Sequence, residues 1–289
     1  MWLLIGGDSE IGAATQQFLE ARDLATTATT RRKERVAANR PFLDLALPLD
    51  RWAPPAGTTA ACIFAAVARI AACEADPRGS AHVNVTQTLA LADRLLSRGI
   101  PVLYLSTNQV FDGTIANVAP DAPYCPVTEY GRQKVLAETA LRDRIDQGAP
   151  VAILRLAKVV SKDMPLLCGW IDALAAGKPI RAFYDMTMAP AEIGMVSTVI
   201  AALMRDSARG IFQLTGPRDL SYLEIGRYVA KTLGADPALV IEGNAADAGL
   251  PAGSARAHTT LDSSRLRDAY GISVPDILKI IDSIIIAPR

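Results

Sequence analysis

The sequence predicts an α/β fold, with a doubly wound parallel sheet of the Rossmann type and a smaller C-terminal lobe. Short runs that are apolar almost throughout alternate with helical patterns along the first two-thirds of the chain. Strands covered on both faces of a parallel sheet have this composition. The repeated order of strand, helix and strand implies right-handed βαβ units, which build a doubly wound sheet. The 289 residues, half of them hydrophobic, suffice for one large domain or for one domain plus a smaller one.

Apolar runs and helical patterns define the expected elements. Strands are expected at Trp2–Gly6, Ala25–Thr30, Phe42–Leu45, Ala61–Val67, Pro101–Thr107 and Val151–Ala157. A helical pattern at Ile11–Arg22 follows the first strand, and another at Ala81–Gly99 leads into the fifth.

The pattern changes after about residue 157, where Pro and Gly interrupt the segments. We therefore expect a domain over residues 1–157 and a smaller, less regular lobe over 158–289. The pattern leaves open a return of the chain to the sheet. Within the lobe, Ser221 and Glu224 have the spacing of a capping box at the start of a helix.

Composition argues against several classes of protein. The formal net charge of zero gives no electrostatic reason to expect nucleic acid or an anionic membrane as partner. The chain start lacks a basic segment, and no apolar run reaches the ~20 residues that span a bilayer, so a cytoplasmic location is expected. None of the four cysteines forms a CxxC pair, and reduced, buried thiols are expected. The only histidines, His82 and His258, give poor support for a metal site or a Ser-His-Asp triad, and no metal is predicted.

A glycine-rich turn joins the first strand to the first helix. In the segment GGDSEIG, Gly6, Ser9 and Gly12 occupy the three positions of a G-x-x-S-x-x-G pattern. Such a turn lets backbone N–H groups approach a pyrophosphate at the helix N-terminus, which predicts cofactor contacts from Gly6, Ser9, Glu10, Ile11 and Gly12. Ser9 stands where glycine is common, and its N–H and hydroxyl could still donate to phosphate. The alternative is an ordinary tight turn.

Arg31 and Arg32 end the second strand, beside the position that an adenosine ribose would take. An acidic residue there would accept from a free 2′-hydroxyl, whereas arginines suit a 2′-phosphate through charge-assisted contacts. NADP(H) is therefore favoured, and NAD(H) stays open as the second choice. The alternative is that RRKER is the solvated start of a helix. Asp44 and Leu45, at the end of the third expected strand, are predicted beside the cofactor, where Asp44 would accept from the adenine amino group.

Four polar side chains are expected at the end of the fifth strand and at the start of the helix that follows it. Ser106 and Thr107 end the fifth strand, in LSTNQVFDG, and residues at this end of a parallel strand face the ligand crevice. Tyr130 and Lys134, in TEYGRQK, lie on one helix face about 5–6 Å apart at Cβ. A hydroxyl, a tyrosine and a lysine would thus converge where a nicotinamide would lie. The alternative for the last two residues is a solvated helix face.

Several motifs together resemble one family. They are the N-terminal G-x-x-x-x-x-G turn, AAVARIAACEADP with a later Asn, STNQVFDG, YGRQK and GIFQLTGPRDLSYLEIG, and they span nearly the whole chain. The sequence resembles an extended short-chain dehydrogenase/reductase, and within it the dTDP-4-dehydrorhamnose reductase-like sugar-nucleotide-binding proteins. The combination of STxxVFDG with YGRxK about 25 residues later is specific.

The resemblance implies a role for each matched residue. Tyr130 would be the catalytic acid/base and Lys134 its partner, both also touching the cofactor, while Thr107 would bind the substrate carbonyl or hydroxyl. Residues along the cofactor would be Ala65, Ala66 and Val67. A lysine ammonium within ~4–6 Å lowers a phenol pKa from near 10 by roughly 1–3 units, so a lowered pKa is expected for Tyr130.

The activity implied is reduction, with NADPH, of a nucleotide-activated 4-keto-6-deoxy sugar in carbohydrate biosynthesis. Asn108 and Gln109 stand where this family usually reads Asp-Tyr, and DMTMAPAEIGMVSTVI lacks the family's acidic pair, so the identity of the sugar stays open. Substrate contacts are predicted for Gln109, Val110, Phe111, Lys158, Trp170, Arg181, Met186 and Arg218.

Other functions stay open as well. One is another sugar-nucleotide activity, of the epimerase or dehydratase type, although Asn108 and Gln109 cannot act as the acid or base that dehydratases usually carry there. Another is a non-catalytic NADP-binding regulatory subunit, because relatives of this family include the regulatory subunit of methionine adenosyltransferase and fold does not guarantee turnover. A homodimer also stays open.

Overall fold

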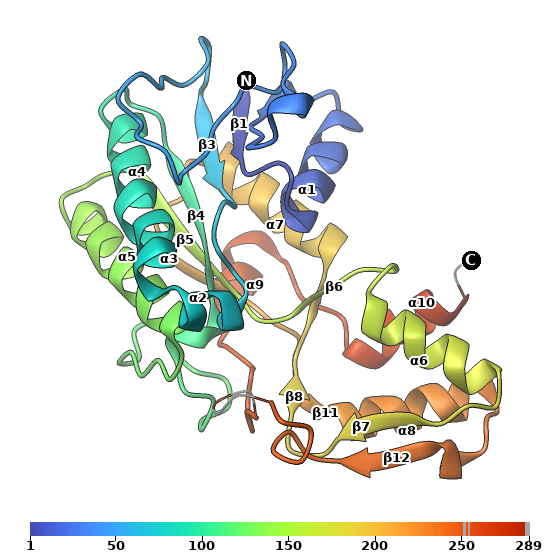
Figure 1. Cartoon of the computed structure of the whole chain (residues 1–289). Coiled ribbons are helices and arrows are strands. Elements are labelled where there is room, and N and C mark those ends of the chain that lie inside the picture. The colour runs from blue at the N-terminus through green and yellow to red at the C-terminus, as the bar shows by residue number, and fades with distance from the viewer. Residues whose placement is uncertain (251–252, 254, 287–289) are drawn as a thin grey trace.

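A six-stranded parallel sheet forms the centre of the computed structural model, which describes residues 1–250, 253 and 255–286. The strand order is β10-β5-β4-β3-β1-β2, and every neighbouring pair is parallel (Figure 1). The strands are β1 (Trp2–Ile5), β2 (Thr26–Ala28), β3 (Ala60–Ile63), β4 (Val102–Thr107), β5 (Val151–Leu156) and β10 (Gly210–Leu214). The chain moves from β1 to β2 on one side and then to β3 on the other, so the order reverses beside β1. This confirms the predicted Rossmann-type α/β fold.

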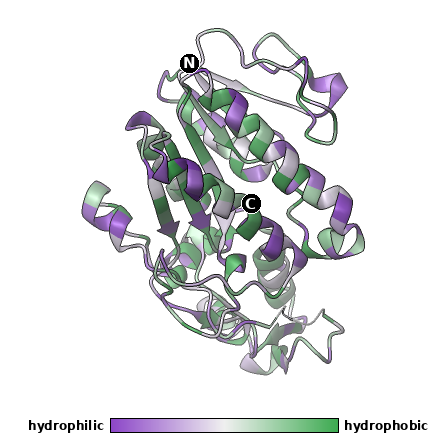
Figure 2. Cartoon of the chain, turned by 90° about the vertical axis from the view of Figure 1, so that its left-hand side faces the viewer, coloured by the Kyte–Doolittle hydropathy of each residue, from purple (hydrophilic) through white to green (hydrophobic). Residues whose placement is uncertain are grey.

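Helices cover both faces of the sheet. They are α1 (Glu10–Glu20), α2 (Ile70–Ala75), α3 (Pro77–Ala81), α4 (Thr88–Leu96), α5 (Glu129–Asp146), α7 (Ile193–Arg205) and α9 (Ser264–Tyr270). Leu4 of β1 packs in one hydrophobic cluster with residues of α1 and α7, whereas Leu3 and Ile5 pack in another with residues of α4 and α5. Successive side chains of a strand point to opposite faces, so apolar residues at both parities require helices on each side. Figure 2 shows the strands mostly in hydrophobic colours and the helices in mixed ones.

The prediction of a third strand at Phe42–Leu45 is wrong. The segment Phe42–Leu45 forms no strand, and it is held to the chain after β2 by an isolated bridge between Thr30 and Phe42. Leu43 and Leu45 are nevertheless buried in the core, so the segment has the alternation of a strand without a ladder of hydrogen bonds. The sixth strand of the sheet is β10, which lies much later in the sequence and pairs with β5.

A second body packs beside the sheet domain (Figure 1). Its elements are α6 (Pro165–Ala175), β7 (Ile180–Phe183), β8 (Thr187–Met188), β11 (Leu220–Ser221), α8 (Tyr222–Leu233), β12 (Val240–Gly243) and α10 (Ile277–Ile286). Residues of α6, α8 and α10 share one hydrophobic cluster with β7. The predicted capping box is confirmed, because the Ser221 side chain accepts from the Glu224 N–H and the Glu224 side chain accepts from the Ser221 N–H.

The chain passes between the two bodies more than once. A short parallel pair of β6 (Val159–Val160) and β9 (Ala191–Glu192) lies where it leaves and returns. After β9 it forms the helix α7, which packs on the sheet, and the strand β10, which belongs to it, and then enters the second body again at β11. Residues 158–289 therefore do not form one continuous lobe, since α7, β10 and α9 pack on the sheet domain.

The cysteines and the helices test two further expectations, on buried thiols and on membrane-spanning segments. Cys62 and Cys73 are buried thiols, as predicted, but Cys125 is exposed on the loop before α5. Within residues 1–250, 253 and 255–286, no helix has the length and apolar character needed to cross a membrane.

Candidate active site

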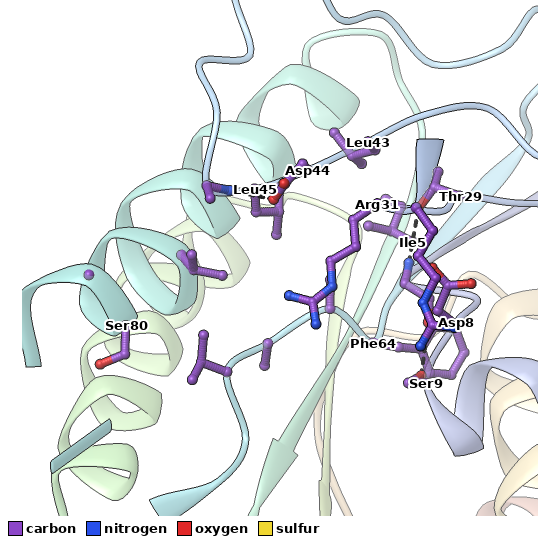
Figure 3. Close-up of a pocket in the computed structure, with 18 of the residues that line it drawn as sticks. Ile5, Asp8, Ser9, Thr29, Arg31, Leu43, Asp44, Leu45, Phe64 and Ser80 are labelled. Atoms are coloured by element: carbon purple, nitrogen blue, oxygen red, sulfur yellow. Dashed lines mark hydrogen bonds between the residues drawn. The ribbon is translucent and has the colours of Figure 1, made fainter. Parts of the chain in front are cut away.

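A cavity of about 600 Å³ opens at the carboxyl ends of β1, β2 and β3, where the strand order reverses (Figure 3). Ligands of open α/β sheets bind at this kind of switch point. The residues that line it include nine of the predicted cofactor contacts: Gly6, Ser9, Arg31, Arg32, Asp44, Leu45, Ala65, Ala66 and Val67. Figure 3 shows the Arg31 side chain extending between Asp8 and Ser80.

The glycine-rich turn brings β1 close to the end of β3. Gly6 has a φ of +94°, and a Cβ there would lie 2.7 Å from the Ala65 nitrogen, so glycine is required. Ser9 is the N-cap of α1: its hydroxyl donates to the Gly6 carbonyl (2.9 Å) and accepts from the Gly12 N–H (3.0 Å). The Ser9 N–H also bonds to the Gly6 carbonyl. The expectation that Ser9 donates to phosphate is therefore wrong for this conformation, because the turn itself uses both donors.

The first turn of α1 still offers backbone donors. Glu10 and Ile11 open the helix, and N–H groups in a first helical turn have no intrahelical acceptor, which makes them available to an anion. The Glu10 side chain points to other partners, since Glu10 Oε1 accepts from the Ser161 hydroxyl (2.8 Å).

Two arginines line the end of the cavity where a ribose is predicted to lie. Arg31 and Arg32 are exposed, and neither has an ion-pair partner in the described part of the chain. Asp44 lines the same end, where its carboxylate accepts from the Ala46 N–H (2.9 Å). The chain after β2 thus turns two unneutralised guanidinium groups toward solvent and cavity.

Asn84 fixes the segment after β3, and sequence reasoning did not assign it a role. Its amide accepts from the Val67 N–H (2.8 Å) and donates to the Val67 carbonyl (3.0 Å) and to Gln133 Oε1 (2.7 Å). Asn84 lies in a π-helical stretch, His82–Gln87, and is 1% exposed. The pair Asn84–Gln133 therefore ties the cofactor-side segment to α5, the helix of Tyr130.

Lys134 is buried, and its ammonium is bound to β4. Lys134 Nζ donates to the Tyr104 hydroxyl (2.9 Å) and the Leu105 carbonyl (2.8 Å), and lies 5.8 Å from the centre of the Tyr130 ring. Burial lowers the pKa of Lys134 to about 8, while the charge of Glu138 opposes that shift. Burial also raises the pKa of Tyr130. The expected lowering of the Tyr130 pKa by Lys134 is therefore wrong.

Thr107 ends β4 and caps the 3-10 turn Asn108–Val110. Its hydroxyl accepts from the Gln109 N–H (3.2 Å). The same turn touches the start of α5: a Cβ on Gly131 would lie 2.3 Å from the Gln109 carbonyl oxygen. Glycine after Tyr130 thus permits the close approach that brings the loop of Thr107 beside the helix of Tyr130 and Lys134.

A segment near the C-terminus closes over the loop after β4. Arg256 donates to the Phe111 carbonyl (2.7 Å) and to Gln109 Oε1 (2.5 Å), and the His258 N–H donates to the Gly113 carbonyl (2.9 Å). Asp219 anchors the same segment through bonds from the backbone N–H groups and hydroxyls of residues 259 and 260. Sequence reasoning missed Arg256 and Asp219, because nothing local to either residue signals a contact with a distant segment of the chain.

Burial contradicts three of the predicted substrate contacts, and the others stay predictions. Val110, Phe111 and Trp170 are buried in hydrophobic clusters, where apolar burial rather than ligand contact explains them. Arg218 forms an ion pair with Asp276 (2.6 Å). The other predicted residues differ in exposure: Gln109 and Met186 are half-buried, and Lys158 and Arg181 are exposed.

An ion pair lies under the site, entirely within the protein. Arg155 of β5 and Glu138 of α5 are both 0% exposed, and Arg155 Nη2 lies 2.7 Å from Glu138 Oε2. Glu138 also accepts from the hydroxyls of Ser106 and Tyr124, and Arg155 donates to Gln213 Oε1 (3.0 Å). The pair thus connects β4, β5 and β10 to the helix that carries Tyr130 and Lys134.

The sheet order, the glycine-rich turn and the cavity at the switch point define a Rossmann-type nucleotide-binding protein. The chain belongs to the family described as the RmlD substrate binding domain, whose model matches residues 1–286. It is 31% identical over 221 residues, 74% of this chain and 72% of the relative, to the probable low-salt glycan biosynthesis reductase Agl14 of Haloferax volcanii. It is 27% identical over 242 residues, 83% of this chain and 81% of the relative, to the dTDP-4-keto-6-deoxy-D-glucose reductase of Streptomyces niveus.

Among solved structures, the dTDP-4-dehydrorhamnose reductase of Bacillus anthracis in complex with NADP has a TM-score of 0.78. The alignment covers 99% of this chain and 97% of that one at 14% identity, a level that supports the fold alone. Family membership confirms the resemblance to the dTDP-4-dehydrorhamnose reductase-like proteins and identifies an oxidoreductase of the RmlD-like family.

Proposed function

We propose that the protein is an NADPH-dependent reductase of a nucleotide-activated 4-keto-6-deoxy sugar. The observation that carries the proposal is the cavity at the switch point of the sheet, which the glycine-rich turn, Arg31 and Arg32 line. The loop after β4, which packs against the helix of Tyr130, follows the carboxyl end of a strand in the same parallel sheet, although its residues do not line that cavity. The names of the relatives agree, since one is a dTDP-4-keto-6-deoxy-D-glucose reductase and another a probable glycan biosynthesis reductase.

The residues present fit a bound NADP(H). The first turn of α1 would receive the pyrophosphate, Arg31 and Arg32 the 2′-phosphate, and Ala65, Ala66 and Val67 would lie along the dinucleotide. Bound NADPH would supply a hydride to the carbonyl carbon of the sugar.

We assign Tyr130 the role of proton donor. Its pKa is raised by burial, so the phenol is protonated at neutral pH and can donate to the carbonyl oxygen, which becomes a hydroxyl. Lys134 lies close enough to stabilise the phenolate that remains, since opposite charges in a buried site attract strongly. Thr107 is proposed to hold the substrate oxygen.

Consumption of NADPH tests this function. Purified protein is mixed with NADPH and a panel of dTDP- and UDP-linked 4-keto-6-deoxy sugars, and absorbance of the reduced cofactor is followed with the sugar product identified by mass. Turnover with one of them supports a reductase. A product that is isomerised or dehydrated without net loss of NADPH would instead support the epimerase or dehydratase alternative. Binding of NADPH without turnover of any sugar would support the regulatory-subunit alternative. The cytoplasmic location and a homodimer stay predictions.

The cofactor preference is expected to depend on Arg31 and Arg32. Each charge-assisted phosphate contact contributes roughly 1.5–3 kcal/mol, so the double replacement Arg31→Ala, Arg32→Ala should weaken NADPH tenfold or more and leave NADH little changed. Fluorescence titration of both cofactors measures this, with NADH as the matched control. A wild type that binds NADH as tightly as NADPH would contradict the assignment.

The affinity for NADPH should also depend on pH through Lys134. Below a pKa of about 8 its ammonium attracts the anionic cofactor, and above that pKa the neutral amine does not. We therefore expect wild-type affinity to decline as the pH rises from about 7 to about 9, with a midpoint at or above the Lys134 pKa because bound anions favour the ammonium. Lys134→Met should bind more weakly throughout and lose this dependence. The same decline in both proteins would assign it to another group.

A further inference from the structure

An aspartate stands among the arginines of the cofactor cavity. Asp8 belongs to the glycine-rich turn and lines the cavity together with Arg31 and Arg32. A carboxylate at the ribose end normally accepts from a 2′-hydroxyl and repels a 2′-phosphate. Asp8 therefore opposes the cofactor choice that the two arginines favour, unless something neutralises it.

Both carboxylate oxygens of Asp8 already have protein donors. The Thr30 hydroxyl donates to Asp8 Oδ2 (2.6 Å), while Arg40 Nη2 (3.0 Å) and Arg35 Nη1 (3.5 Å) donate to Oδ1. Burial by itself raises the pKa of Asp8, but the hydrogen bonds from Thr30 and Arg40 outweigh it and hold the pKa below its usual value. Asp8 is thus ionised and paired, with its acceptor positions turned toward the chain after β2.

Arg40 is better placed than Arg35 to neutralise Asp8. It also donates to the Gly7 carbonyl (3.2 Å), and its side chain is 24% exposed, against 49% for Arg35. In the described residues its Nε is buried without a hydrogen-bond partner, an arrangement that costs free energy. Arg40 does not line the cavity, although Arg32 and Leu43 on either side of it in the sequence do. Its effect on a ligand would therefore pass through Asp8.

We propose that Arg40 is a specificity-determining positioning residue: by holding and neutralising Asp8, it leaves Arg31 and Arg32 free to bind a phosphate and so selects the phosphorylated cofactor. Without Arg40, Asp8 Oδ1 would keep only the longer and more exposed contact with Arg35, so its carboxylate would be better able to accept from the 2′-hydroxyl of NADH and would repel the phosphate of NADPH. The inference rests on the proposed use of NADPH and adds a residue outside the cavity that enforces it.

A double-mutant cycle tests the proposal, with dissociation constants of NADPH and NADH measured by fluorescence titration. Arg40→Gln should weaken NADPH about ten- to hundredfold, since it leaves one unneutralised charge near the phosphate, and should leave NADH unchanged or bound more tightly. Asp8→Asn should bind NADPH at least as tightly as wild type. Adding Asp8→Asn to Arg40→Gln should restore most of the lost NADPH affinity.

Arg35→Gln is the matched control, because this arginine makes a longer, more exposed contact with the same oxygen, and its effect should be less than about threefold. If Arg40→Gln costs as much NADPH affinity in the Asp8→Asn variant as in the wild type, Arg40 acts directly and the proposal is overturned. An equal loss of affinity for NADPH and NADH would mean that Arg40 only supports the structure of the cavity. If Arg40→Gln does not fold, tighter or equal NADPH binding by Asp8→Asn still supports the proposal, and weaker binding overturns it. A wild type that prefers NADH would instead refute the proposed cofactor itself.

Discussion

Replacing Tyr130 by Phe is expected to lower turnover by ~10²–10⁴-fold, the usual contribution of a positioned acid or base. The change removes one oxygen from a half-buried ring at the start of α5 and keeps the ring itself. The free energy of unfolding and the affinity for NADPH should therefore barely change. Steady-state NADPH oxidation with the sugar identified from the panel measures turnover, and fluorescence titration measures the cofactor affinity separately.

Tyr104→Phe is the matched control for this experiment. It removes a second hydroxyl near Lys134, the one that accepts from Lys134 Nζ, but leaves the proposed proton donor in place. Loss of an acceptor for the ammonium should lower the pKa of Lys134 further and move the alkaline decline of NADPH affinity to lower pH. A wild-type rate in Tyr130→Phe would refute the proposed mechanism, and an equal fall in both variants would mean that the hydroxyls act only by holding Lys134.

The pH profile of the reaction separates the structure-based mechanism from the one expected from sequence. A lysine that lowered the Tyr130 pKa would make reduction decline as the phenol ionised at mildly alkaline pH. Because burial raises this pKa instead, the phenol should stay protonated there, and the decline should follow Lys134. The four-residue spacing correctly put Tyr130 and Lys134 on one helix face, but it contained no information on the acceptors of Lys134.

Those acceptors explain what sequence could and could not predict. The glycine-rich turn, the arginines after β2 and the residues after β3 are local patterns next to strands, and each contributes residues to the cavity wall, although Glu10, Ile11 and Gly12 do not line it. Tyr104 and Leu105 take the Lys134 ammonium only because β4 and α5 pack together, although the two elements are far apart in the sequence. Ser9 shows the opposite case, where the turn itself uses the donors that the motif offers, because the Ser9 hydroxyl and N–H both donate to the Gly6 carbonyl.

Apolar patterns were ambiguous for a similar reason. Leu43 and Leu45 alternate toward the core as a strand would, but pairing along a sheet edge depends on a partner that the local sequence does not contain. Trp170 was expected at the substrate, and it is instead packed edge-to-face with Tyr222 in the core of the second body. The local sequence around a buried aromatic residue can resemble that around an aromatic residue that binds a ligand, and only the packing in the fold distinguishes the two.

Replacing Arg155 by Met should lower the free energy of unfolding by about 3–5 kcal/mol, the cost of leaving the partner charge buried and unpaired. Methionine fills much of the same volume, so the loss should come from Glu138, whose carboxylate would keep only its hydroxyl donors from Ser106 and Tyr124. Because Glu138 lies one helical turn after Lys134, turnover should fall as well, even where the variant remains folded. Urea denaturation followed by circular dichroism measures the stability.

The surface pair of Arg144 with Asp93 provides the control, since Arg144 also lies on α5 but Asp93 is 53% exposed. Arg144→Met should cost no more than about 1 kcal/mol, the range of exposed ion pairs. Adding Glu138→Gln to Arg155→Met should recover part of the stability, because a neutral amide is less costly to bury than an unpaired carboxylate. Equal losses at the buried and the exposed pair, or no recovery in the double variant, would mean that Arg155 stabilises the fold through its bonds to Gln213 and the Pro120 carbonyl rather than by neutralising Glu138.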